Sequence, residues 1–225
     1  MSSFSIRLYK DLDYEVVRGL FARGILEHSH MAFRHAISVT RNWLFMLVMF
    51  LVPLCVTGSV ILSILAVVIA LIIIWICSRY VYSYYVAHCL SDDMLNIQKY
   101  YLQRDGYRFW VAESGGEVVG AVAAVPSSFS SEEKHTELKR LTVARSHRGK
   151  GIAKALCRTV IEFARNRGSD AVVLETSLPQ TDAWKLYEKM GFHRTLTIRQ
   201  LYVTFRVIDF VLFRYQYDLL ANKLF

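Results

Sequence analysis

The chain has 225 residues, of which 54% are apolar, and its mean hydropathy is +0.28, so we expect one domain of ordinary size with an added membrane segment. One stretch, Lys139 to Arg167, holds nine Lys or Arg against Glu162 alone, so its net charge equals the formal net charge of +8 of the whole chain. This local excess without interleaved aromatic residues argues against a nucleic-acid-binding protein. The four cysteines lack metal-ligand spacing, which argues against a zinc site and a disulfide framework.

The first residues predict a strand followed by a helix. Phe4 to Tyr9 alternates apolar and polar residues, which is typical of a short strand. Asp11 and Asp13 offer helix caps before an amphipathic run from Tyr14 to Glu27. Three histidines come next, and we interpret them as surface residues near a membrane and not as metal ligands: His28, His30 and His35.

The next stretch, Trp43 to Cys77, contains 35 residues without a charge. As one straight helix it would measure about 52 Å, against a hydrocarbon core of roughly 30 Å. Four residues in its first half offer a break, which favours a helical hairpin: Pro53, Thr57, Gly58 and Ser59. One long tilted span and a hairpin that crosses only partly stay open, and a buried core hairpin is the least favoured reading.

The chain looks globular from Ser91 onward. Asp92 to Leu102 predicts a helix capped by Ser91, and the strands Phe109 to Ala112 and Val118 to Val125 flank a Gly-Gly hairpin turn. Pro126 to Lys134 is a Ser-rich surface loop.

The stretch from Thr136 to Arg167 predicts a strand, a polar turn and a helix. Thr136 to Val143 reads as the strand, and Gly151 to Arg167 carries apolar residues at helical spacing. Gly149 and Gly151 therefore open a helix directly after a strand, where several backbone N–H groups have no partner within the helix. Together with the positive end of the helix dipole, these donors form an anion site that can hold a pyrophosphate.

The last part predicts a closing sheet. Ala171 to Glu175 is typical of a buried parallel strand, and Gln180 to Met190 is helical with Gly191 as its stop signal. Thr195 to Val203 and Phe205 to Phe213 read as strands. The aromatic tail that follows is open between a strand and a segment on the membrane surface.

Two of these motifs resemble one known superfamily. Arg148-Gly-x-Gly-Ile-Ala, followed by the Leu-Tyr-x-x-x-Gly-Phe that ends at Phe192, resembles the acetyl-CoA-binding core of the GNAT N-acetyltransferases. With the uncharged insert and the phrases at 109–114, 147–156 and 173–176, the chain is similar to the camello-like membrane N-acetyltransferases, which include the cysteine S-conjugate N-acetyltransferases.

The resemblance implies an α/β (α+β) fold with a mixed, mostly antiparallel sheet flanked by helices and an inserted transmembrane hairpin. The implied parts are residues 1–42 (first strand and helix), 43–78 (hydrophobic segment) and 79–225 (main part of the domain).

The resemblance also implies a cofactor site for acetyl-CoA and no metal. The pantetheine arm lies where the fourth strand splays from the fifth, and the Leu141 N–H serves as oxyanion donor. A bulge in the fourth strand, frequent in the family, would reconcile its mixed charged and apolar residues. Lys139 or Arg145 is a weaker candidate for the 3′-phosphate. The implied cofactor residues are Leu141, Thr142, Val143, Arg148, Gly149, Lys150, Gly151, Ile152, Ala153 and Gln180, the last replacing the Asn usual in the family.

Two residues are the catalytic candidates. Tyr187 matches the family's Leu-Tyr motif as the acid that protonates the coenzyme A sulfur. Glu137 lies where many members carry a glutamate base, acting directly or through water, and Glu175 is the next candidate. The structural alternative for Tyr187 is a tyrosine that only packs its helix on the sheet. The structural alternative for Glu137 is a surface carboxylate at the end of a strand.

The resemblance implies an enzyme of the endoplasmic reticulum and possibly Golgi membranes, whose acceptor is the α-amine of a cysteine S-conjugate or a protein lysine. Because residues 4–27 must pack on the later strands, both ends of the insert lie on one side of the bilayer. Arg34, Arg41 and Arg79 indicate the cytosolic side. The expected partners are therefore an amine acceptor and a bilayer, and not nucleic acid. A catalytically inactive membrane scaffold is the alternative of a different class.

Overall fold

A computed structural model describes residues 4–129, 134–199 and 203–219, in which one seven-stranded sheet forms the domain. Its strand order is β1-β2-β3-β4-β5-β7-β6, and only β4 and β5 run parallel, which confirms the predicted mixed, mostly antiparallel sheet. The first strand pairs with β2, so the start of the chain joins the sheet formed after the apolar insert. The strands are β1 (Ser5–Leu8), β2 (Arg108–Ser114), β3 (Glu117–Pro126), β4 (His135–Val143), β5 (Ala171–Ser177), β6 (His193–Arg199) and β7 (Val211–Asp218).

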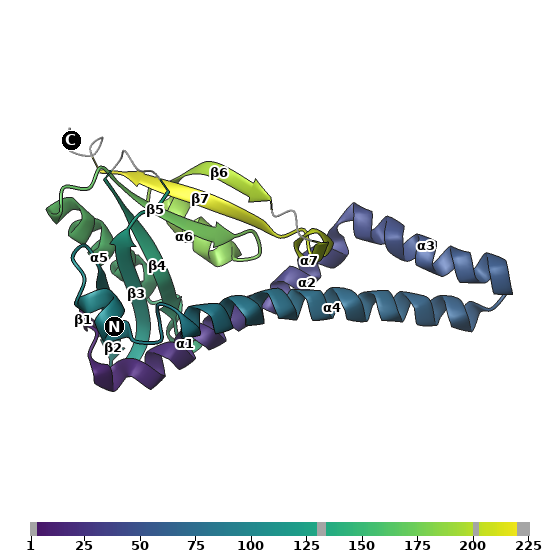
Figure 1. Ribbon diagram of the computed structural model, residues 1–225, viewed down its shortest axis with the longest axis horizontal. Coiled ribbons are helices and arrows are strands. Elements are labelled where there is room, and N and C mark those ends of the chain that lie inside the picture. Colours follow the sequence, from purple (N-terminus) through teal and green to yellow (C-terminus); the bar gives the residue numbers. More distant parts are fainter. Residues whose placement is uncertain (1–3, 130–133, 200–202, 220–225) are drawn as a thin grey trace.

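Helices cover both faces of this sheet (Figure 1). On one face lie α5 (Ile152–Asn166) and α6 (Thr181–Lys189), and the apolar side of α5 forms a core with the strands. On the other face, α1 (Tyr14–Leu26) and the end of α4 (Val60–Ser91) pack on β2 and β3. The sheet is therefore the middle layer, and its parallel pair β4–β5 lies near its centre.

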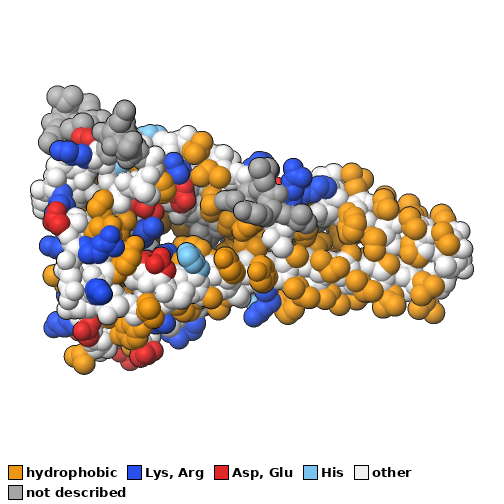
Figure 2. Space-filling view, viewed as in Figure 1, with side chains coloured by type: hydrophobic (Ala, Val, Ile, Leu, Met, Phe, Trp, Pro, Cys, Tyr) orange, Lys and Arg blue, Asp and Glu red, His pale blue; other side chains and the backbone are white. Residues whose placement is uncertain are grey.

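The apolar insert forms the predicted helical hairpin. Its arms are α3 (Thr40–Thr57) and α4, and they project far from the domain (Figure 1). The turn falls at Gly58, whose φ of 66° is left-handed, while Pro53 lies within α3 and does not end it. Figure 2 shows the projecting end covered with apolar side chains, whereas charged side chains gather on the domain and at the base of the hairpin.

Both arms are long and apolar enough to cross a membrane, and only 11% and 17% of their most apolar windows are buried. Helices α2 (His28–Ser38) and α7 (Val203–Val207) sit at the base of this hairpin and share a small apolar core with α4. A buried core hairpin is thus not what the structure shows, because most of the apolar surface has no protein cover.

Two predicted elements are only partly right. The helix expected at 92–102 forms only in its second half, as the π-helical η2 (Gln98–Leu102), because α4 runs to Ser91 and the chain then turns to bring Asp93 to Arg140. The strand expected at 205–213 begins only at Val211.

The segment before β7 is helical because the hairpin base holds it. In this segment α7 packs on α2 and α4, and the Asn42 amide donates to the Val207 carbonyl at 2.9 Å. Tyr215 and Tyr217 then lie within β7, so the described part of the aromatic tail belongs to the sheet. Parts of the expected loop 126–134 and strand 195–203 lie outside the described residues, as does the end of the tail.

Candidate active site

The central feature of the site is a gap between β4 and β5. Their parallel pairing joins 135–137 to 171–173 and then ends, although both strands continue. The pairing of β4 with β3 shifts register where Arg140 and Leu141 lie opposite Val122, and Arg140 has a φ of 57°. This is the expected β-bulge. The predicted residues Leu141, Thr142 and Val143 therefore form one lip of the gap.

The loop after β4 has the geometry expected of a phosphate-binding turn. A short 3₁₀ turn, η3 (Arg145–His147), leads into Gly149 and Gly151, whose φ values of 77° and 83° are left-handed. A Cβ added at either glycine would meet no atom within 4 Å, so the surrounding space is open to a ligand. These glycines, with Lys150, place the open loop at the N-terminus of α5, and the residues present fit a diphosphate. The helix then continues through Ile152 and Ala153.

Arg148 has partners inside the protein. Its guanidinium lies 2.8 Å from the Glu27 carboxylate at the end of α1, and its Nε donates to the Val143 carbonyl at 3.3 Å. Its charge is thus partly offset by Glu27, which the sequence did not predict. Both side chains line a cavity of 580 Å³ between α1 and the loop; the other lining residues are Leu20, Arg23, Gly24, Val143, Ala144, Arg145 and Ser146.

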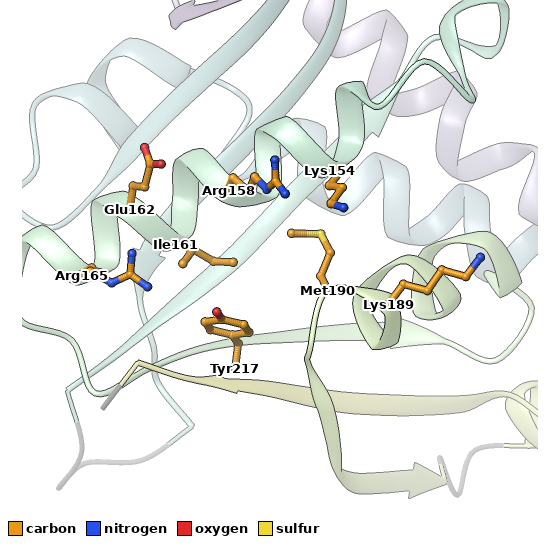
Figure 3. A pocket seen from close by; sticks show the side chains of 8 residues that line it. All are labelled: Lys154, Arg158, Ile161, Glu162, Arg165, Lys189, Met190 and Tyr217. Atoms are coloured by element: carbon orange, nitrogen blue, oxygen red, sulfur yellow. The ribbon is translucent and has the colours of Figure 1, made fainter. Parts of the chain in front are cut away.

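A second, basic groove of 370 Å³ runs along α5 toward α6 and the end of β7 (Figure 3). Its lining combines four cationic side chains and one carboxylate with two apolar side chains and one aromatic ring. Lys139, a candidate for the 3′-phosphate, is not part of it: its ammonium lies 3.5 Å from Glu137. The lining residues are Lys154, Arg158, Ile161, Glu162, Arg165, Lys189, Met190 and Tyr217.

Tyr187, on α6, is 5% exposed, and its ring packs in tilted orientation against the rings of Phe192 and Tyr215, at centroid distances of 5.7 and 6.2 Å. Its hydroxyl makes no hydrogen bond with the described residues. Burial, and then the nearby Cys157 thiol, raise the pKa of Tyr187 well above its ordinary value. The hydroxyl therefore stays protonated at neutral pH, as an acid must be.

Glu137 is 6% exposed and lies on β4 just where the pairing with β5 ends. Burial raises its pKa above the ordinary value of 4.5, against the opposing effect of Lys139. Glu175, the alternative base, is bound at 2.8 Å by Arg214. The raised pKa of Glu137 suits a base near neutral pH, whereas Glu175 is held by the Arg214 guanidinium.

Gln180 lies at the start of α6, but its side chain turns back on β5. Its amide oxygen accepts bonds from the Thr176 hydroxyl and the Ser177 N–H, each at 2.9 Å. The NH2 group of the amide is therefore the part of this side chain that can donate a hydrogen bond to the coenzyme. Among the described residues no group of three His, Cys, Asp or Glu side chains could hold a metal ion.

The sequence missed several residues near the gap. His28 was expected at the surface, but its Nδ1 is enclosed without a hydrogen-bond partner among the described residues, and burial followed by the Arg148 charge lowers its pKa. Neither Arg140 nor Tyr82 was expected to belong to the site, although both bind buried partners beside the gap. The two consecutive cations Lys139 and Arg140, which break the alternation of this strand, were the signal that pointed to Arg140.

Residues 72–192 match the Acetyltransferase (GNAT) family. The chain belongs to the GNAT family of acetyltransferases. "Probable N-acetyltransferase family 8 member 5" of Mus musculus is 43% identical over 216 residues, covering 93% of this chain and 95% of the relative. "N-acetyltransferase 8" of Rattus norvegicus is 44% identical over 196 residues, covering 87% and 88%.

Solved GNAT structures share the fold. One from Staphylococcus aureus Mu50 aligns with a TM-score of 0.52 at 16% identity, covering 96% of this chain and 99% of that one. A spermidine N-acetyltransferase chimera "from Vibrio cholerae and hSSAT" aligns with a TM-score of 0.57 at 13% identity, covering 100% of both chains. The family and its relatives make this GNAT protein an N-acetyltransferase that takes its acetyl group from acetyl-CoA.

Proposed function

We propose that this GNAT enzyme acetylates the α-amine of cysteine S-conjugates at a membrane surface. The observation that carries the proposal is the course of α4, which starts at the tip of an apolar hairpin and ends beside the gap between β4 and β5. Acceptors with an apolar S-substituent partition into the interface of a bilayer. An enzyme anchored there meets them at raised local concentration.

The proposed roles follow from the geometry of the gap. Transfer requires a neutral, positioned amine, a donor to the thioester oxygen and a proton for the departing sulfur. The lip Leu141–Val143 offers backbone donors, with the Leu141 N–H directed at the oxygen. Glu137 takes the proton from the amine, and Tyr187 gives one to the sulfur.

The coenzyme binds with its diphosphate on the loop amides from Gly149 to Ala153, beside Lys150. The basic groove beside α5 suits the nucleotide end, because it offers the Tyr217 ring for contact with a base and cations for a phosphate (Figure 3). Lys154, Arg158 and Lys189 replace Lys139 in this role.

The membrane arrangement is also a proposal. The hairpin turns at Gly58, and its ends both return to the domain, so the enzyme and both ends of the hairpin lie on one side of the bilayer. Trp43 and Trp75, 61% and 43% exposed on the two arms, suit one interface. We place the domain on the cytosolic face of the endoplasmic reticulum, where acetyl-CoA is supplied. An engineered glycosylation site near Gly58 that is modified, with unmodified termini, supports a full crossing, whereas a glycosylated C-terminus overturns this topology.

An acceptor screen on detergent-solubilised protein tests the acceptor. S-benzyl-cysteine, free polyamines and lysine peptides would be compared by release of coenzyme A, with Tyr187→Phe as the control. Preference for S-benzyl-cysteine supports the proposal, preference for lysine peptides shows a protein lysine acetyltransferase, and binding of acetyl-CoA without turnover of any acceptor shows a scaffold.

A further inference from the structure

The hairpin helix α4 bonds to both sides of the gap. The Tyr82 hydroxyl lies 3.2 Å from the Ser177 hydroxyl at the end of β5, in a buried contact. Three residues further along α4, the Tyr85 hydroxyl accepts a bond of 2.8 Å from Arg140 in the β4 bulge. Because residues three apart share one side of a helix, the same side of α4 reaches both strands.

These contacts replace the strand pairing where it is lost. Glu137 pairs with Val173. Leu141 and Ser177 each lie four residues further along their parallel strands, so they are at the same level of the sheet, apart from the one extra residue that the bulge adds to β4. The bond from Tyr82 thus meets β5 at the level of the proposed oxyanion donor. The bond from Arg140 meets β4 next to it.

The contact on the β4 side is anchored by a buried ion pair. The Arg140 side chain is 8% exposed and binds Asp93 through two nitrogens at 2.8 Å, and Asp93 also accepts from the Tyr101 hydroxyl. Asp93 lies two residues beyond the end of α4. Burying such a pair brings little net stability, because desolvation offsets the attraction between the charges. Its consequence is a fixed position of the bulge relative to α4.

We propose that α4 is a spacer that sets the width of the gap receiving the acyl-pantetheine arm, with Tyr82, Tyr85 and Arg140 as positioning residues. Paired strands lie about 4.8 Å apart, which leaves no room for a chain between them. Strands that part need another element to hold their separation, and α4 is bonded to both. The inference rests on the proposed site, because it needs the thioester to enter between β4 and β5.

The preference of the enzyme for a short over a longer acyl group on coenzyme A tests the spacer, and this measurement needs no amine acceptor. Calorimetry would give the Kd of acetyl-CoA and butyryl-CoA for the wild type and for Tyr82→Phe, Tyr85→Phe and Ser177→Ala. Tyr80→Phe is the matched control, because Tyr80 is 58% exposed on the same helix and only stacks on Tyr84. We expect the preference for acetyl-CoA to fall roughly fivefold in the three variants, the equivalent of one ordinary hydrogen bond, and to stay in the control.

The outcomes separate this inference from the proposed site. A variant that is only less stable changes both Kd values by the same factor, which leaves their ratio unchanged. If folded Tyr82→Phe and Ser177→Ala keep the wild-type preference for acetyl-CoA over butyryl-CoA, α4 is not a spacer. The double variant Tyr82→Phe/Ser177→Ala should match either single one, since both remove the same bond. If Tyr82→Phe does not fold, Ser177→Ala tests that bond from the sheet. A wild type that binds neither thioester overturns the proposed site itself.

Discussion

Replacing Tyr187 by phenylalanine should separate activity from stability. The ring keeps its contacts with Phe192 and Tyr215, and the lost hydroxyl makes no hydrogen bond with the described residues. Removing an unbonded oxygen from an apolar site costs nothing in hydrogen bonding. We therefore expect the free energy of unfolding to stay the same or rise by up to about 1 kcal/mol.

Tyr101→Phe provides the contrast. Tyr101 is fully buried, and its hydroxyl donates to Asp93, so its loss leaves a buried carboxylate with one bond fewer. This variant should lose about 1–3 kcal/mol of unfolding free energy. Denaturant unfolding of both variants, followed by tryptophan fluorescence, would measure the difference.

The activity of Tyr187→Phe should fall about 100-fold near neutral pH, within the range for loss of a general acid. A thiol has a pKa of about 8.5, so a coenzyme A thiolate leaves without a proton once the pH is well above that value. The deficit should therefore shrink as the pH rises toward about 9.5. Coenzyme A release measured with a thiol reagent from pH 6 to 10 gives the profile. Turnover equal to the wild type at every pH refutes the role of acid.

Three further changes test other parts of the site. Glu137 must be ionised to act as base and its pKa is raised, so kcat/KM should fall as the pH drops through a value above 4.5. Glu137→Gln should lose activity, and its remaining activity should no longer show this fall at low pH. In Gly24→Ala the new Cβ would lie 2.7 Å from the Thr142 hydroxyl, which should cost about 1–3 kcal/mol by thermal unfolding, and Thr142→Ala in the same chain should recover most of it. Glu27→Gln should free Arg148 and lower the Kd of coenzyme A by about threefold at low salt, measured by calorimetry; an unchanged Kd would show that Arg148 does not bind the diphosphate.

The sequence predicted the parts of the fold that depend on local pattern. The strand, glycine turn and helix from His135 to Asn166 follow from alternation, two glycines and helical spacing, and the structure has all three. The hairpin was predicted from its length without charge, and its turn lies at one of the residues named as a possible break, Gly58.

The failures arose where a distant contact decides the conformation. The stretch 92–97 has a helical pattern, but Asp93 forms an ion pair with Arg140, which is remote in the sequence, and the chain turns here to make that contact. Residues 203–207 have the aromatic and β-branched composition of a strand, yet they dock as a helix on α2 and α4. Likewise, the pairing of Arg148 with Glu27 joins two parts of the chain whose approach no local pattern reveals.

The hairpin also has a consequence for how the chain reaches this fold. The edge strand β1 must find β2 across about a hundred intervening residues, and closing so long a loop costs entropy before any pairing stabilises it. The antiparallel arms of the hairpin shorten that search, because they return the chain close to its starting point. Assembly of the sheet edge should therefore wait until the two arms have come together, and an insert unable to double back would leave β1 without its neighbour.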